Sequence, residues 1–180
     1  LFLLIAIIIK IESRGPFFYH QVRIGKDGRQ FNLIKFRTMI METDEKAHQI
    51  YLKKLFAGDF GPEKSNTELK FKMDPRITKV GKFLRKFSLD ELPQLWNVLK
   101  GDLSLIGPRP PMPFEVEHYE EWQKETLKCR PGMVGLCTLR KVESFEQWIK
   151  IDIEYVKHQS LLLDLKILFR SMIILFKGSV

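Results

Sequence analysis

The hydrophobic positions between residues 92 and 99 recur at helical spacing. They are Leu92, Leu95, Trp96 and Leu99. The pattern predicts a helix that packs one apolar face against a core or a membrane. Pro93 indicates that the helix begins close by, because proline is tolerated in the first turn, where its missing N–H would have had no partner. We therefore expect this helix to start near Asp90.

The two acids at this start, Asp90 and Glu91, allow two interpretations. Ser88 with Glu91 three residues later has the spacing of a capping box, and a helix that starts slightly later would make Asp90 itself the cap. In either case carboxylates stand at the positive end of a helix, among backbone N–H groups that would also stabilise a phosphoryl group. The spacing alone leaves capping and chemistry open.

The segment after this helix predicts a stiff loop. Residues 100–102, KGD, are typical of a helix end, and the sequence GPRP follows at 107–110. Prolines fix φ on both sides of Arg109, which suits a bidentate phosphate clamp. A rigid turn with a solvated arginine is the alternative. Arg130, in the RPG segment at 130–132, repeats the arrangement.

An aromatic, strand-like run begins at Phe17 and leads into a predicted β-hairpin. The Asp-Gly pair at 27–28 supplies the turn, and the second strand is expected over residues 30–36. Lys35 and Arg37 flank Phe36 and so project to one face. They form either a solvated basic face or a phosphate contact.

The two ends of the chain are apolar. Nine apolar residues, LFLLIAIII, precede Lys10; this run is too short to cross a bilayer, which needs roughly 20 residues, and it lacks the features of a signal peptide. Residues 161–176 are also apolar but contain Asp164, Lys166 and Arg170. These charges argue against a full span and favour a helix lying in the membrane interface.

Residues 70–87 contain seven lysines and arginines against one aspartate. Five apolar positions fall on one helical face of this segment: Ile77, Val80, Phe83, Leu84 and Phe87. An interfacial membrane helix and an ordinary surface helix packed on a core both need this pattern, so both remain open.

Three further helices are expected. A charged helix spans residues 42–56 and leads to a polar linker at 58–66. A second spans 115–127, with Val116, Tyr119 and Trp122 on its packed side. A third opens with a capping box formed by Ser144 and Gln147.

Composition limits the possibilities further. A chain of 180 residues suits one domain with a real core. Thirty lysines and arginines against 22 acids give a net charge of +8, which suggests a polyanionic partner. Nucleic acid, an anionic membrane and nucleotide-sugar phosphates all fit. Cys129 and Cys137 lack the spacing of a metal site, so we expect buried or free thiols and a reducing compartment.

Several motifs, in this order, closely resemble the bacterial sugar transferases, the monotopic phosphoglycosyl transferases that start lipid-linked glycan assembly. The motifs are KFRTM at 35–39, SLDELPQLWNVLKGD at 88–102, SLIGPRP at 104–110, RPG at 130–132, Asp152 with Tyr155, and Asp164-Leu165. The resemblance runs from about Gly15 to the C-terminus. It weakens at residues 136–141, LCTLRK, where the family usually has a tryptophan-glutamine and a small-Gly-Arg element.

The resemblance implies an α+β fold, mainly helical with a small β-hairpin. It also implies a monotopic membrane protein. Residues 1–14 would be the C-terminal part of a re-entrant helix, and residues 15–180 a single cytoplasm-facing catalytic domain that includes interfacial amphipathic helices. The expected location is the cytoplasmic face of a bacterial inner (plasma) membrane.

The implied activity moves a sugar-1-phosphate from a UDP-sugar to polyprenyl (undecaprenyl) phosphate and releases UMP, as the first membrane step of exopolysaccharide, O-antigen or glycoprotein glycan assembly. Asp90 would be the nucleophile of an aspartyl-phosphosugar intermediate, and Asp90 and Glu91 would anchor Mg²⁺. Five basic residues are candidates to bind the phosphates: Lys35, Arg37, Arg85, Arg109 and Arg130. Membrane lipids would be further partners.

Two other classes of function remain. A non-catalytic, basic membrane-surface scaffold would explain the apolar ends and leave the acidic pair as a helix cap. A nucleic-acid-binding module would explain the charge, but the sequence has no recognition motif and the apolar ends would go unexplained. We therefore expect no nucleic-acid partner.

Overall fold

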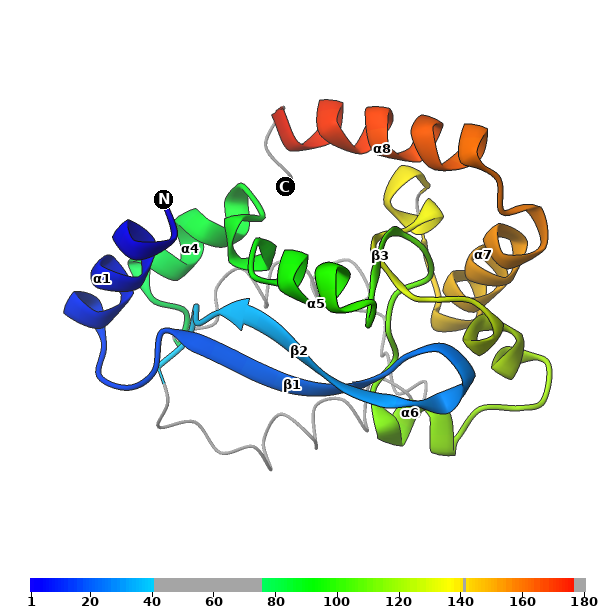
Figure 1. The fold of residues 1–180 in the computed structure, drawn as a ribbon, viewed down its shortest axis with the longest axis horizontal. Helices are drawn as coiled ribbons and strands as arrows, with labels where there is room; N and C mark the ends of the chain where they lie inside the picture. The colour runs from blue at the N-terminus through cyan, green and yellow to red at the C-terminus, as the bar shows by residue number, and fades with distance from the viewer. Residues whose placement is uncertain (41–75, 141, 177–180) are drawn as a thin grey trace.

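The fold is built around a two-stranded β-hairpin that runs along the molecule, with helices gathered above it and at one end (Figure 1). The computed structural model describes residues 1–40, 76–140 and 142–176. Its helices are α1 (Phe2–Glu12), α4 (Lys79–Lys86), α5 (Gln94–Lys100), α6 (Pro113–Glu117), α7 (Phe145–His158) and α8 (Leu161–Phe176). Its strands are β1 (Phe18–Ile24), β2 (Gln30–Phe36), β3 (Ser104–Ile106) and β4 (Gly132–Val134). Four 3₁₀ turns complete the description: η1 (Lys26–Gly28), η3 (Leu89–Glu91), η4 (Gln123–Lys128) and η5 (Leu136–Leu139). The expected mixed fold, mainly helical with a small antiparallel hairpin, is confirmed.

The hairpin has the predicted turn and second strand. Strands β1 and β2 pair antiparallel from Phe18 opposite Phe36 to Ile24 opposite Gln30. At the turn, Asp27 and Gly28 have φ angles of 56° and 78°. This left-handed region costs glycine nothing and aspartate little, which explains why an Asp-Gly pair stands there.

Helix α4 is fixed at its N-terminus by two side chains. Thr78 Oγ1 accepts a hydrogen bond from the Gly81 amide at 2.9 Å. The carboxylate of Glu12, the last residue of α1, accepts from the first two amides of α4 at 2.6 and 2.9 Å. A Cβ on Gly81 would lie 2.2 Å from the Thr38 carbonyl oxygen, so only glycine lets α4 approach the chain that leaves the hairpin. The core beneath consists of Ile5, Ile9, Phe36 and Leu84.

A short parallel pair of strands, β3 and β4, joins the two loops in which proline adjoins an arginine. The Gly107 amide donates to the Val134 carbonyl at 3.0 Å, and the Gly132 amide donates to the Pro108 carbonyl at 2.8 Å. A Cβ on Gly132 would lie 2.1 Å from the Gly107 nitrogen. The GPRP and RPG loops therefore lie side by side, a pairing that the sequence did not predict.

Helices α7 and α8 pack on this second sheet. The predicted Ser144 cap is present, with its Oγ accepting from the Gln147 amide at 3.1 Å. Tyr155 is completely buried, and its hydroxyl donates to Asp164 Oδ1 at 2.7 Å, which fixes the start of α8 against α7. Cys129 and Cys137 are free and buried, as expected.

Helix α5 has the predicted apolar face, but this face points to solvent. Leu95, Trp96 and Leu99 are 41%, 56% and 79% exposed. The opposite, polar face is buried, with Gln94 at 4% and Asn97 at 1% exposure. The apolar face of α5 therefore does not contribute to the core beneath it and forms part of the exposed surface.

The hydrogen bonds of Asn97 explain this orientation. Its Oδ1 accepts from the Ile34 amide at 3.1 Å, and its Nδ2 donates to the Asn32 carbonyl at 2.8 Å. Both partners are backbone groups of β2, whose outer edge has no neighbouring strand in the described part of the chain. A buried strand edge needs such partners, and an amide side chain supplies a donor and an acceptor at once.

Two sequence predictions are wrong. Ser88 does not cap a helix: it has a φ of 51°, its side chain makes no capping bond, and the acids occupy η3 before α5 begins. The predicted helix at 115–127 is divided into α6 and η4, because Gln123 Oε1 accepts from the Glu120 amide at 2.7 Å and starts a new turn. The three apolar residues assigned to this helix still pack together against α7.

No helix in the described ranges is long and apolar enough to cross a membrane. The apolar stripe of α4 is split, with Leu84 buried while Phe83 and Phe87 are exposed. The helix expected at 42–56, the linker at 58–66 and the start of the basic segment at 70–75 lie outside the described residues.

Candidate active site

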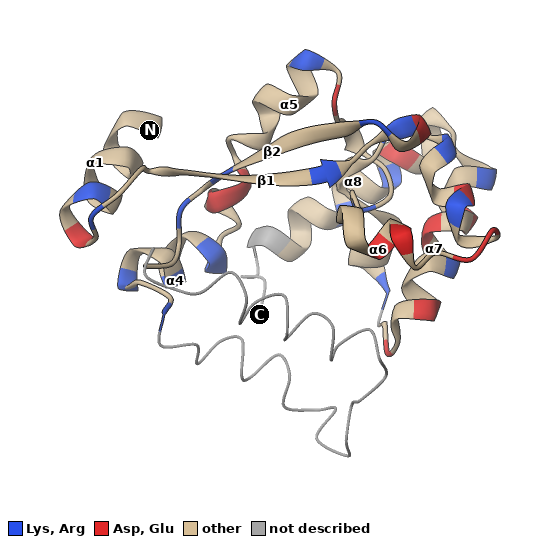
Figure 2. Ribbon diagram, turned by 90° about the horizontal axis from the view of Figure 1, so that it is seen from below, with Lys and Arg blue, Asp and Glu red and all other residues tan. Residues whose placement is uncertain are grey.

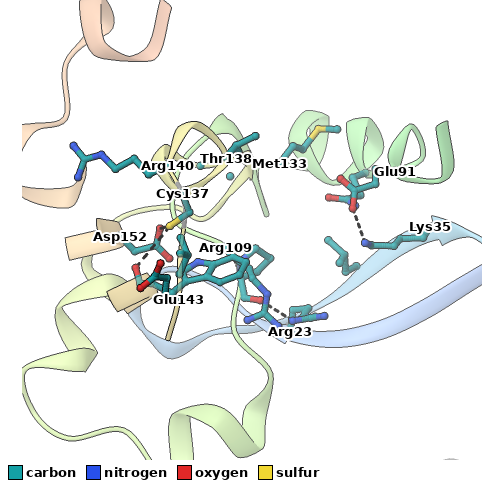
Figure 3. Close-up of a pocket in the computed structure, with 17 residues that line it drawn as sticks. Arg23, Lys35, Glu91, Arg109, Met133, Cys137, Thr138, Arg140, Glu143 and Asp152 are labelled. Atoms are coloured by element: carbon teal, nitrogen blue, oxygen red, sulfur yellow. Dashed lines mark hydrogen bonds and ion pairs between the residues drawn. The ribbon is translucent and has the colours of Figure 1, made fainter. Parts of the chain in front are cut away.

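A cavity of about 1070 Å³ opens between the hairpin, the GPRP loop and the start of α7 (Figure 3). Its side chains come from β1, β2, η3, α5, the loop at 107–110, β4, η5 and α7. The charged residues that line it are Arg23, Lys35, Glu91, Arg109, Arg140, Glu143 and Asp152. The volume is slightly above the roughly 300–1000 Å³ usual for small-molecule sites, so a ligand of the size of a nucleotide sugar has room.

The acidic pair stands at one end of this cavity. Glu91 lines it, and Glu91 Oε1 lies 2.7 Å from Lys35 Nζ on β2. Asp90, its neighbour in η3, is set back from the cavity-lining side chains. Burial raises the pKa of Asp90; Lys35 and Arg85 act in the opposite direction, and Glu91 adds to the increase. Asp90 is therefore a partly desolvated carboxylate with two cations nearby.

Two of the five predicted phosphate-binding residues, Lys35 and Arg85, face this pair. Lys35 projects from β2 toward Glu91, as Figure 3 shows. Arg85, near the end of α4, donates from Nε to Thr38 Oγ1 at 2.9 Å, which holds its guanidinium near Asp90.

Arg109 lies farther into the cavity and is held by two side chains. It forms a bidentate pair with the buried carboxylate of Glu115, at 3.0 and 3.1 Å. Its guanidinium also lies over the ring of Trp148, 5.7 Å from the centroid. Burial disfavours its charge, but Glu115 outweighs burial and raises the pKa of Arg109. The stiff loop thus presents a rigid cation to the cavity, as its prolines predicted.

Arg37 and Arg130 are not brought to the cavity. Arg37 is buried and turned toward the end of α1, where its guanidinium donates to the carbonyls of Ser13 and Arg14. Arg130 is exposed and lies outside the cavity lining. The Arg37 guanidinium thus points to the end of α1 while Lys35 reaches Glu91, and the phosphate-binding role expected of Arg37 and Arg130 stays a prediction.

Arg23 and Asp152 are cavity residues whose part in the site sequence reasoning missed. Arg23 is 8% exposed and lies beside Arg109 (Figure 3). Burial and the charge of Arg109 lower the pKa of Arg23 to about 10. The sequence offered one indication: Arg23 follows Gln21 by two residues on a predicted strand, which places both side chains on one face.

Asp152 belongs to one of the motifs that resemble the family, but the sequence analysis assigned it no role. It accepts from the Cys137 thiol at 3.2 Å. Burial raises its pKa to about 6, although the Cys137 thiol and Arg109 act in the opposite direction.

The donor set at the acidic pair fits a magnesium ion. No cluster of three or more His, Cys, Asp or Glu side chains occurs among the residues that the structure describes. Mg²⁺ does not require one, because it binds through one or two carboxylates and completes its shell with water and substrate phosphates. Asp90 and Glu91 supply two adjacent carboxylates, and Lys35 already neutralises one oxygen of Glu91.

Charged residues of both signs surround the site. Figure 2 shows acidic residues on α6, both acidic and basic residues on α7, and basic residues on α4. The cavity lining runs from Lys35 and Glu91 to Asp152 on α7. Its cations lie beside Glu91 and at the arginines in the middle.

Comparison with known proteins decides the family. The model of the family described as bacterial sugar transferase matches residues 1–178. The chain belongs to the bacterial sugar transferase family. The resemblance found in the motifs is thereby confirmed over nearly the whole sequence.

Relatives of this sugar transferase have named activities or pathways. It is 40% identical to the exopolysaccharide production protein ExoY of Sinorhizobium fredii, over 99% of this chain and 79% of that one. It is 43% identical to the undecaprenyl-phosphate galactose phosphotransferase of Salmonella typhimurium, over 87% of this chain and 33% of that one. It is 39% identical to the galactosyl transferase CpsE of Streptococcus agalactiae, over 93% of this chain and 36% of that one. The sequence thus spans about a third of the length of the last two proteins.

Proposed function

We propose that this protein is a phosphoglycosyl transferase that moves a sugar-1-phosphate from a UDP-sugar to polyprenyl (undecaprenyl) phosphate. The relatives named as undecaprenyl-phosphate transferases support this class of reaction. The observation that carries the proposal is the position of Asp90, a partly desolvated carboxylate influenced by Lys35 and Arg85 and adjacent to Glu91, which lines a cavity large enough for a nucleotide sugar. The product would enter exopolysaccharide or another surface glycan, as the name of ExoY suggests.

The reaction proceeds in two displacements. In the first, a carboxylate oxygen of Asp90 attacks the sugar-bearing phosphorus of the donor, the bond to the bridging oxygen breaks, and UMP leaves with the electron pair. In the second, a phosphate oxygen of the lipid acceptor attacks the same phosphorus. The bond from this phosphorus to Asp90 breaks, which restores the carboxylate and yields a polyprenyl-diphosphate sugar.

The described side chains support the first step in separate ways. Removal from water makes the Asp90 carboxylate a stronger nucleophile. Lys35 and Arg85 reduce its repulsion from the incoming phosphoryl oxygens. Mg²⁺, held by Asp90 and Glu91, would supply further charge neutralisation on the diphosphate.

The exposed apolar side chains support a membrane-bound location for the acceptor reaction. Three helices carry several each: α1 has Leu3, Leu4 and Ile7, α5 has Leu95, Trp96 and Leu99, and α8 has Leu161, Leu162 and Phe169. In Figure 1 all three lie above the hairpin, with α8 at the top and α5 closest to β2. Such a surface suits a monotopic protein lying on the cytoplasmic face of the bacterial inner membrane, where membrane lipids and the polyprenyl phosphate are available.

The first experiment is intact-protein mass spectrometry. The purified protein is mixed with Mg²⁺ and a panel of UDP-sugars, without lipid acceptor. A mass gain of one sugar-phosphate is expected with the correct donor and is expected to be absent in Asp90→Asn, because an amide oxygen is a poor nucleophile. Removing Mg²⁺ with EDTA should also suppress the adduct.

The controls separate chemistry from folding. Asp27→Asn changes an exposed aspartate in the hairpin turn, outside the cavity lining, and should leave the adduct unchanged. If no donor gives an adduct while polyprenyl phosphate restores full turnover, the transfer is direct and Asp90 is not the nucleophile. If neither adduct nor turnover occurs, the protein is better explained as a non-catalytic scaffold.

A further inference from the structure

The cavity is lined by cations beyond those near Asp90. The charges of Lys35 and Arg85 lower the pKa of Asp90, where the transferred phosphate would be attached, and Glu91 raises it. Arg23 and Arg109 form a second group of cations in the same cavity. Their role is not explained by the attack on phosphorus.

The two groups lie next to each other. The charges of Arg109 and Glu91 both act on the pKa of Arg23. Figure 3 shows Lys35 and Glu91 at one end of the cavity and Arg23 and Arg109 toward its middle. The second phosphate of a diphosphate bound at Asp90 is only one P–O–P link away, and it would extend toward these arginines.

Arg23 is fixed by hydrogen bonds and keeps further N–H donors available. Its Nε and one terminal nitrogen donate to Gln21 Oε1 at 3.2 and 2.7 Å, and its other terminal nitrogen donates to the Pro110 carbonyl at 2.9 Å. A guanidinium has five N–H groups, so two remain without an acceptor among the described residues. Both acceptors are neutral, which leaves the full charge of Arg23 uncompensated by its own hydrogen bonds.

The surroundings of the pair leave room for an anion. Glu115 forms its bidentate pair with Arg109, whereas Glu115 and Glu91 act on Arg23 only through their charge, and the hydrogen bonds of Arg23 go to Gln21 and Pro110. Burial together with repulsion from Arg109 lowers the pKa of Arg23 to about 10, so the surroundings disfavour the charged form of this side chain. A bound phosphate would relieve both effects.

We propose that Arg23, with Arg109, binds the phosphate of the departing nucleotide, the one that remains on UMP. This inference rests on the proposed function. When the bond between the sugar-bearing phosphorus and the bridging oxygen breaks, the electron pair stays on that oxygen, and the nucleotide phosphate changes from one negative charge to two. Cations fixed at that position gain attraction as the bond breaks, so they stabilise the leaving group in the transition state.

The experiment compares the binding of uridine, UMP, UDP and a hexose-1-phosphate by isothermal titration calorimetry or competition. Arg23→Gln should weaken UMP and UDP binding by about 10- to 100-fold and leave uridine unchanged, because only the phosphate contact is lost. Arg23→Lys should be intermediate, since it keeps the charge without the fork of donors. Arg29→Gln removes the same charge from the exposed hairpin turn and should change UMP affinity by less than about twofold.

Three results would overturn the inference. UMP affinity that survives Arg23→Gln would remove Arg23 from the phosphate site. Equal losses for uridine and UMP would mean that Arg23 only holds the β1 strand to the Pro110 loop. A loss for the hexose-1-phosphate but not for UMP would assign the arginines to the transferred phosphate.

These outcomes are separable from a failure of the proposed function. UMP binding needs no covalent intermediate, so the inference stands if Arg23→Gln weakens UMP selectively even when no sugar-phosphate adduct forms. Conversely, an adduct that forms on Asp90 at an unchanged rate in Arg23→Gln would preserve the proposed function and reject this role of Arg23.

Discussion

At the scale of single residues, burial raises the pKa of Asp152, an acid that lines the cavity. Asp152 is 2% exposed, and its pKa rises to about 6 because burial disfavours the carboxylate. The folded protein therefore holds a proton on Asp152 up to about pH 6, whereas the unfolded chain releases it near pH 4. The contribution of Asp152 to stability is complete below pH 4, declines between pH 4 and 6, and stays lower above pH 6.

Replacing the Asp152 carboxyl by an amide should remove the part of the pH dependence of stability that Asp152 causes. For Asp152→Asn, the free energy of unfolding relative to the wild type should rise by about 3 kcal/mol between pH 4 and pH 7. Urea unfolding at the two pH values measures it. Glu117→Gln, at an exposed position on α6, serves as the control and should show no such rise. A difference that is constant with pH would mean that Asp152 ionises normally in the folded protein.

At the scale of elements, the glycines at the β3–β4 crossing position the candidate site. Gly107 and Gly132 let the GPRP loop and the RPG loop approach to backbone contact, with hydrogen bonds of 2.8 and 3.0 Å on either side. Arg109 is presented from the first of these loops, and β4 residues line the cavity beside it. The close approach of two backbones thus fixes one wall of the cavity.

A methyl group at this crossing should be far more costly than one at an open turn. Gly132→Ala would place a Cβ 2.1 Å from the Gly107 nitrogen and should destabilise the protein by at least about 3 kcal/mol. Gly101→Ala meets no atom within 4 Å and only the strain of a φ of 84°, at a cost of about 1–2 kcal/mol. Urea unfolding of both variants provides the comparison. Equal losses would show that the loops separate at little cost.

At the scale of the whole molecule, helices α1, α5 and α8 share an unusual property. Their exposed residues are large and apolar, and α5 exposes its apolar face while it buries amides against β2. The edge of a strand requires hydrogen-bonding partners, so the polar face of α5 lies inward. Its apolar face is then exposed and available for contact with lipid.

This arrangement predicts which residues attach the protein to lipid. The triple variant Leu95→Gln, Trp96→Gln, Leu99→Gln should bind anionic phospholipid vesicles at least about tenfold more weakly in a sedimentation assay. Its thermal unfolding should change little, because none of the three side chains is buried. Val22→Gln, an exposed apolar position on β1, should retain full binding. Unchanged vesicle binding by the triple variant would exclude α5 from the lipid contact.

The sequence by itself determined the hairpin with its Asp-Gly turn, the bounds of α8, the Ser144 cap and the motifs that identify the family. These features depend on local rules: alternation, turn chemistry and capping act within a few residues. The sequence also drew attention to Asp90, Glu91, Lys35, Arg85 and Arg109, which the structure places around one cavity and its rim.

Only the tertiary structure decided which face of α5 lies inward, because a periodic pattern defines two faces without saying what each one meets. The tertiary structure likewise places Arg23 in the cavity lining and leaves Arg37 and Arg130 outside it. Where an arginine side chain ends is set by acceptors distant in the sequence, such as the carbonyl of Pro110, 87 residues after Arg23. Periodicity and short motifs carry no information about such pairings, so the chemistry of the cavity emerges only when the loops are packed together.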